Sequence, residues 1–144
     1  MIKKKLIYFS ALLFFGCTTS QVNIANSVNL SGYNYATMLD VISYGGSTGL
    51  MNLEIEIYNA LLTTRLNIIG DREINSISET QKQHLLLVRF SASQRIGQYS
   101  TVSTVAINFV DYLTGRPIAS FIGTSELGFS NAINAATKKM QEMF

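Results

Sequence analysis

Alternation of hydrophobic and polar positions predicts a β-hairpin over residues 100–123. Val105, Ile107 and Phe109 have the same parity, so an extended backbone places all three on one face of a sheet. Asn108 has the opposite parity and points to the other face. The sequence Asp-Tyr-Leu-Thr-Gly that follows predicts the turn, because Asp accepts hydrogen bonds from downstream amides and Gly tolerates a positive φ. We therefore expect this hairpin to form the framework of a sheet.

The remaining pattern predicts two helices and further strands. Apolar positions at helical spacing predict a helix from Leu50 to about Leu66, and both parities are apolar from residue 85, which is typical of a central strand covered on two sides. In chain order we expect a strand at 33–42, a helix at 50–66, a short strand within 67–74, a loop or helical turn at 75–83, a strand at 85–92, a turn at 93–98, the hairpin and a helix at 130–143. The fold class is therefore α+β. The order β-α-β-β-β-β-α predicts a mostly antiparallel sheet of about four or five strands with two helices packed on one face.

The N-terminus has the three parts of a secretory signal peptide. A basic head is followed by a ten-residue apolar run, Leu6 to Phe15, and by Gly16-Cys17. The run is too short to span a membrane, which takes about 20 apolar residues. We therefore predict a signal peptide at residues 1–16 and a lipid attached to Cys17, the first residue of the mature chain. The alternatives are an ordinary signal peptide or a buried structural cysteine.

Composition then divides the mature chain into a tether and one domain. Residues 18–32 are rich in small polar groups and carry no charge, which predicts that residues 17–32 are a flexible tether after the lipidated Cys17. Residues 33–144 are then expected to form a single α+β domain. Removal of the three lysines of the signal peptide lowers the formal charge from +2 to −1. Such a domain has no basic field for phosphate backbones, so we expect no nucleic-acid partner. The single cysteine excludes an intrachain disulfide.

Two groups of charged residues are candidates for a binding site. Glu54 projects from the apolar side of the predicted helix, although a carboxylate near a helix N-terminus is also favoured by the dipole alone. Asp71 and Arg72 lie in the densest charge cluster, which is either a partner-binding site or a solvated bend. Several tyrosines suit an interface, but strand packing also explains them; they are Tyr33, Tyr35, Tyr44, Tyr58, Tyr99 and Tyr112.

Residues suited to catalysis are sparse. His84 is the only histidine and follows a loop, and with Cys17 committed to lipid we expect no metal site. Asp111 is either a turn former or, together with Glu126, a cation ligand. Residues 45–49, Gly-Gly-Ser-Thr-Gly, lack the lysine of a phosphate-binding loop and predict only a helix cap. We therefore expect no catalytic residue and no cofactor.

Three motifs give the chain a resemblance to a known group. Leu13-Phe14-Phe15-Gly16-Cys17 resembles a bacterial lipobox, and residues 66–73 and 110–115 carry a helix-to-strand exit with Asp-Arg and an Asp-x-x-Thr-Gly turn. Together they look like bacterial envelope lipoproteins with a small α/β domain: the curli secretion subunit family, the lipoprotein activators of penicillin-binding proteins, and short lipoproteins of unknown function. The resemblance implies a triacylated Cys17 and no catalytic residue. Thr18 after the cysteine is similar to lipoproteins sorted to the outer membrane.

The sequence thus favours a non-enzymatic lipoprotein on the periplasmic face of the outer membrane. Its domain is expected to bind another envelope protein or to self-assemble, with Asn108 on the face left free by the helices. The alternative is a periplasmic module for a small ligand or glycan, with Glu54 and the tyrosines facing a cleft.

Overall fold

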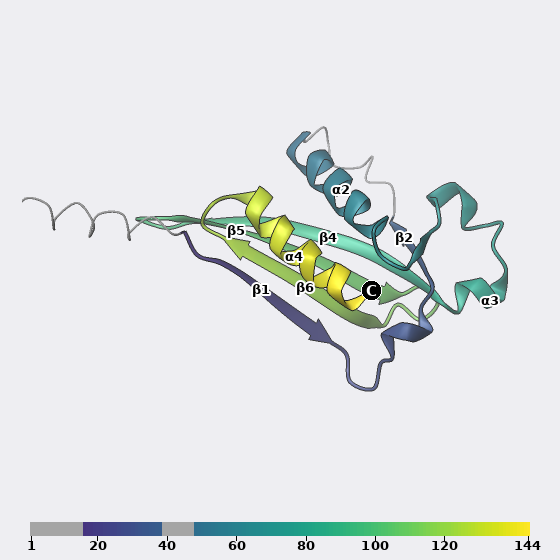
Figure 1. Ribbon diagram of the computed structural model, residues 1–144. Coiled ribbons are helices and arrows are strands. Elements are labelled where there is room, and N and C mark those ends of the chain that lie inside the picture. The colour runs from purple at the N-terminus through teal and green to yellow at the C-terminus, as the bar shows by residue number, and fades with distance from the viewer. Residues whose placement is uncertain (1–15, 39–47) are drawn as a thin grey trace, which may run out of the picture.

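The computed structural model describes residues 16–38 and 48–144, which fold as a sheet covered on one face by two helices (Figure 1). The strands are β1 (Thr18–Ile24), β2 (Tyr35–Met38), β3 (Asn67–Ile68), β4 (Leu85–Ile96), β5 (Thr101–Asp111) and β6 (Pro117–Ser125). The helices are α2 (Thr48–Leu61), α3 (Glu79–Lys82) and α4 (Phe129–Met143), with 3-10 turns η1 (Leu30–Gly32) and η2 (Asp71–Glu73). Four predictions lie wholly or partly outside the described residues: the signal peptide, the end of the first strand at 39–42, the candidate Tyr44, and the cap at 45–49.

The sheet has six strands in the order β1-β6-β5-β4-β2-β3. The β1/β6, β5/β6 and β4/β5 pairs are antiparallel, whereas β2 is parallel to both β3 and β4. The α+β class and the mostly antiparallel sheet are confirmed. Within the described ranges, none of the helices is long and apolar enough to cross a membrane.

The sixth strand comes from the segment predicted to be a tether. Thr18–Ile24 pairs along its whole length with β6, from Thr18 opposite Ser125 to Ile24 opposite Ala119. The prediction of a flexible tether over residues 17–32 is therefore wrong for this segment. β1 is an edge strand with mostly exposed side chains, so backbone hydrogen bonds rather than an apolar pattern specify it.

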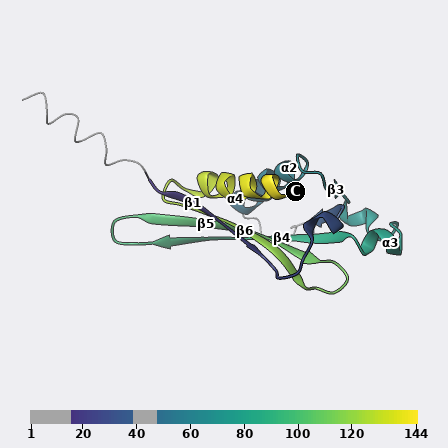
Figure 2. The same ribbon diagram turned by 60° about the horizontal axis from the view of Figure 1, so that its bottom comes forward.

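The β4–β5 hairpin is longer than predicted. Residues 93–98 were expected to form a turn, but β4 continues to Ile96, which pairs with Thr101, and the reversal occupies residues 97–100. The cross-strand ladder therefore persists past the end of the hydrophobic pattern. Figures 1 and 2 show this hairpin, in teal and green, projecting beyond β6 and α4.

The helices cover the predicted face of the sheet. Val105, Ile107 and Phe109 are fully buried in one core with both helices, as the shared parity predicts. The residues that α2 and α4 bury in the same core are Leu53, Ile57, Leu61, Ala132, Ile133, Ala136 and Met140. Figure 2 shows the two layers nearly edge-on, with α2 and α4 on the same side of the sheet.

The opposite face of the sheet is covered only in part. Leu85 and Leu87 are buried there outside the main core, next to Tyr35, whose hydroxyl accepts a hydrogen bond of 3.5 Å from Nε2 of Gln81. Farther along the sheet, Ala106 and Asn108 are only half-buried. This second face is therefore the wetter one.

Gly123 lets α4 lie directly on β6. A Cβ at this position would be 1.8 Å from the carbonyl oxygen of Ala132 and 2.8 Å from the backbone nitrogen of Ala136. Only glycine permits so close an approach of strand and helix backbones. The position of α4 thus depends on one residue of β6.

Candidate functional site

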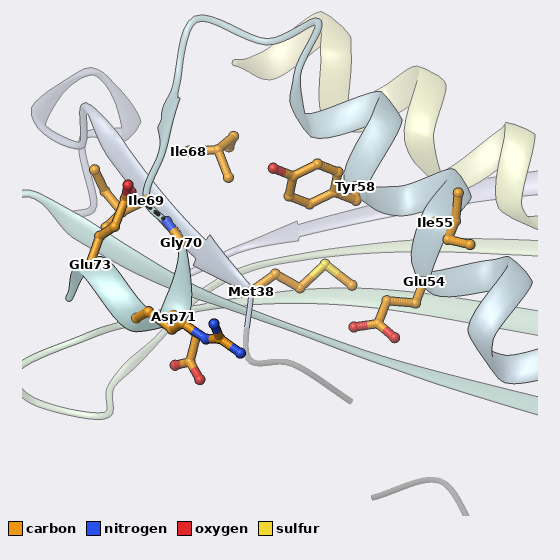
Figure 3. Close-up of a pocket in the computed structure, with 10 residues that line it drawn as sticks. Met38, Glu54, Ile55, Tyr58, Ile68, Ile69, Gly70, Asp71 and Glu73 are labelled. Carbon is orange, nitrogen blue, oxygen red and sulfur yellow. Dashed lines mark hydrogen bonds between the residues drawn. The ribbon is translucent and has the colours of Figure 1, made fainter. Parts of the chain in front are cut away.

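An open cleft of about 770 Å³ lies beside α2 and contains three of the predicted binding residues. Glu54 lines it from α2, and Asp71 and Arg72 line it from η2. The cleft is completed by Met38, Ile55, Tyr58, Ile68, Ile69, Gly70 and Glu73. Figure 3 shows the α2 side chains on one side, the η2 segment on the other, and Met38 between them.

A local hydrogen-bond pair fixes the η2 wall of the cleft. The backbone N–H of Gly70 donates to Oε2 of Glu73 at 3.2 Å, and the N–H of Glu73 donates to the carbonyl of Gly70 at 2.9 Å (Figure 3). These hydrogen bonds lie within the turn and do not involve the side chains of Asp71 and Arg72, which are exposed. Within the described ranges, neither of them forms an ion pair.

Glu54 lies at the border between two apolar stripes of α2. At about 100° per residue, it projects between the buried stripe of Ile57 and Leu61 and the exposed side of the helix. Its side chain is half-buried, which agrees with this border position. The structure therefore places Glu54 inside a cleft together with Tyr58, and the other predicted tyrosines in the described ranges lie elsewhere.

The exposed stripe of α2 was missed by the sequence reading. Met51, Ile55 and Tyr58 of α2 and Leu62, which directly follows it, have a 4-3-4 spacing and are 58%, 51%, 43% and 55% exposed. The N–H of Leu62 donates to the carbonyl of Tyr58 at 3.1 Å and so continues the helical pattern. This spacing places all four on one helical face, distinct from the face packed on the sheet. A search for a second apolar period in residues 50–62 would have found it.

Asn108 does not belong to this cleft. It lies on the sheet face opposite the helices, where its Oδ1 accepts a hydrogen bond of 2.8 Å from the Ser120 hydroxyl. It lines a separate shallow hollow of about 370 Å³ beside β1 and β6. The structure thus separates Asn108 from Glu54, Asp71 and Arg72.

A second polar cluster surrounds Asp111 and is a turn structure. Oδ1 of Asp111 accepts hydrogen bonds of 2.8 Å from the N–H and from the hydroxyl of Thr114, which confirms Asp111 as a turn former. Burial alone would raise the pKa of Asp111, but the bonds from Thr114 and Tyr33 outweigh it and lower that pKa. Burial and the bond to Asp111 raise the pKa of Tyr33 to about 12. Glu126 follows the far end of β6, so it cannot share a cation with Asp111.

His84 contributes to the fold near the same cluster. Its Nδ1 lies 2.7 Å from the carbonyl oxygen of Gly32, and its own carbonyl accepts hydrogen bonds from the N–H groups of Asn34 and Tyr35. Across residues 16–38 and 48–144, no three His, Cys, Asp or Glu side chains lie close enough to hold a metal ion. The histidine therefore connects β4 to the segment that leads into β2.

The cleft beside α2 has the chemistry of a binding site. A carboxylate on each wall, a guanidinium and a tyrosine can recognise hydroxyl or amino groups, and the apolar rim can contact a protein or a sugar ring. Cys17 lies apart from it, exposed at the start of β1.

Comparisons with known proteins show likeness in fold alone. No family model matches the chain, and no curated protein matches it. Among solved structures, the PelC dodecamer from Paraburkholderia phytofirmans is similar in two crystal forms, one of a point variant, with TM-scores of 0.50 and 0.51. Identity is 14%, and the match covers 88% of this chain and 97 to 98% of PelC. A PDZ domain protein from Parabacteroides distasonis matches with 12% identity and a TM-score of 0.52; the match covers 95% of this chain but 38% of that protein.

Proposed function

We propose that this chain is a non-enzymatic lipoprotein of the cell envelope, anchored through Cys17, whose domain assembles with further copies of itself. The observation that carries the proposal is the exposed apolar stripe of α2, formed by Met51, Ile55, Tyr58 and Leu62. Alternatively, the same stripe binds another envelope protein.

The stripe has the properties of an interface. α2 already buries one apolar face on the sheet, and the second apolar face, with four large exposed side chains, does not belong to the core of the described residues. Tyrosine and methionine are enriched in interfaces, where they supply contact area. The PelC structures similar to this chain are dodecamers, so this fold accommodates oligomers in that protein.

The position of Cys17 supports the anchor. It is exposed, and it immediately precedes the edge strand β1, so a lipid on it would not disturb the core. The test is Cys17→Ser followed by fractionation of the cells. We expect the variant to leave the membrane fraction, and unchanged attachment would contradict the anchor.

Self-assembly is tested by sedimentation of the full chain, extracted from membranes in detergent. The double variant Ile55→Ser, Tyr58→Ser should shift the protein from an oligomer to a monomer. Leu113→Ser is the matched control, because Leu113 is 51% exposed in the β5–β6 turn, away from α2. A wild-type monomer that crosslinks to no partner in the envelope would reject the proposal.

The cleft supports a second candidate function, a binding module for a small ligand or glycan. Its support is the cleft of about 770 Å³ in which Glu54, Tyr58 and Arg72 meet. Titration calorimetry with maltotetraose and with chitotetraose tests it, with Glu54→Gln and Arg72→Ala as variants. Binding that both variants weaken, in a protein that stays monomeric, would favour this function over self-assembly.

A further inference from the structure

One end of the sheet gathers three segments that are distant in sequence. Thr18 of β1 is opposite Ser125 of β6, Ser125 is opposite Ser103 of β5, and Ser103 is opposite Gln94 of β4. These residues form a row across four neighbouring strands. Beyond the row, β4 and β5 continue alone as a two-stranded hairpin, closed by residues 97–100 (Figures 1 and 2). The start of β1, the end of β6 and the hairpin tip therefore lie at one end of the domain.

This end exposes large apolar side chains. Ile96 and Tyr99 at the hairpin tip are 80% and 93% exposed, the two highest values among the exposed large hydrophobic residues described. Leu127, in the turn after β6, is 57% exposed. The charged residues next to these side chains in sequence are Arg95 and Glu126, which have opposite signs. Such a surface suits the interface of a bilayer, where tyrosine and aliphatic side chains are favoured.

The N-terminal segment enters the domain at the same end. The N–H of Glu126 donates to the carbonyl oxygen of Cys17 at 3.3 Å. In the uncleaved chain, a Cβ on Gly16 would be 2.5 Å from Cδ2 of Leu127, so the position directly before Cys17 lies against this side chain. A lipid on Cys17 would therefore lie close to Leu127, at this same end of the sheet.

We infer that this end of the sheet, formed by the hairpin tip and Leu127 beside Cys17, lies against the lipid bilayer. The inference rests on the anchor of the proposed function and adds a second point of contact. β1 and β4 are three strand spacings apart, about 14 Å, so the lipid and the tip contact the bilayer at separate points. Two points fix the orientation of the domain, whereas an anchor alone leaves it free to turn. β4 and β5 then run away from the membrane, and the turn after Asp111 lies at the distal end.

A tryptophan scan tests this orientation, since the chain contains no tryptophan. Tyr99→Trp and Leu127→Trp place a single reporter at the proposed contact. Leu113→Trp is the matched control, because Leu113 is 51% exposed at the opposite end of the sheet. The full chain, purified from membranes, is reconstituted into phosphatidylethanolamine and phosphatidylglycerol vesicles with or without brominated phosphatidylcholine, a quencher that acts only in contact with the bilayer.

We expect brominated lipid to remove most of the emission at positions 99 and 127 and to leave position 113 almost unchanged. Equal quenching at all three positions, or none at position 99, would overturn the inference. Recovery of the protein outside the membrane fraction would overturn it together with the anchor. Sedimentation of the same samples tests self-assembly separately. A monomer whose emission is quenched at positions 99 and 127 would support the orientation and contradict self-assembly.

Discussion

The hydroxyl of Tyr33 donates a hydrogen bond of 2.9 Å to Oδ2 of Asp111, although 78 positions separate the two residues in sequence. The other carboxylate oxygen of Asp111 holds the β5–β6 turn through Thr114. The carbonyl of Tyr33 also accepts a hydrogen bond of 2.7 Å from the guanidinium of Arg65. Tyr33, which lies shortly before β2, therefore connects the β5–β6 turn to the segment that follows α2.

Tyr33→Phe should destabilise the domain by about 1.5 kcal/mol, because it removes a hydrogen bond to a carboxylate and keeps the ring. The pKa of Tyr33 is raised to about 12, so the folded state favours the neutral phenol. In wild type this contribution is complete below the unfolded pKa of about 10 and is lost as the pH rises toward 12. Urea denaturation between these pH values should show a fall in the free energy of unfolding that is smaller in Tyr33→Phe.

Tyr99→Phe is the control for this change, because it removes a hydroxyl from a ring that is 93% exposed. It should leave the free energy of unfolding close to the wild-type value at neutral pH. Equal effects of the two substitutions would show that the Tyr33–Asp111 bond does not contribute to stability.

Asp111→Asn should reduce the sensitivity of the domain to acid. The pKa of Asp111 is lowered in the folded protein, so the ionised form stabilises the fold above the unfolded pKa of about 3.9. That contribution is lost as the pH falls below this value toward the folded pKa. The difference in unfolding free energy between wild type and variant should therefore shrink below about pH 4. Asp71→Asn removes a charge from an exposed aspartate, and the same shrinkage there would contradict the assignment to Asp111.

Gly123→Ala should displace α4 from the sheet. The added Cβ would meet the carbonyl oxygen of Ala132 at 1.8 Å, and backbone atoms cannot move aside as a side chain can. We expect a loss of about 3 kcal/mol in urea denaturation. Gly32→Ala is the control, because no atom lies within 4 Å of its Cβ position. A variant at position 123 as stable as this control would contradict the close contact of β6 and α4.

Parity predicted the helix-covered face of the sheet because Val105, Ile107 and Phe109 supply much of the buried surface that selects it. The alternation of apolar and polar positions could not predict β1. Only Val22 of its seven side chains is even half-buried, so the strand is specified by backbone pairing with β6, which leaves no period in the sequence. The extension of β4 to Ile96 was missed for the same reason, since its outer residues are exposed.

The sequence identified single residues of the candidate site but did not show that they line one cleft. Glu54 was identified because a carboxylate interrupts an apolar helix face, and Asp71 and Arg72 because they form a dense charge cluster. Their meeting in one cleft depends on the parallel β2/β3 pairing, which brings η2 beside α2. That pairing involves only two residues of each strand, Tyr35 with Asn67 and Ala36 with Ile68, too few for a sequence pattern.

Phe144→Ala should cause a large loss of stability, although Phe144 follows the last helix. Phe144 is 8% exposed, and its ring centroid lies 4.9 Å from that of Phe109 and 6.0 Å from that of Phe121. The guanidinium carbon of Arg65 lies 5.9 Å from the ring centroid, and the N–H of Arg65 donates to the carbonyl of Phe144 at 3.1 Å. Truncation of a buried phenylalanine costs about 3 to 5 kcal/mol, whereas Met143→Ala, at 41% exposure, should cost far less. Equal denaturation midpoints for these two neighbouring variants would mean that the aromatic cluster is not part of the stabilising core.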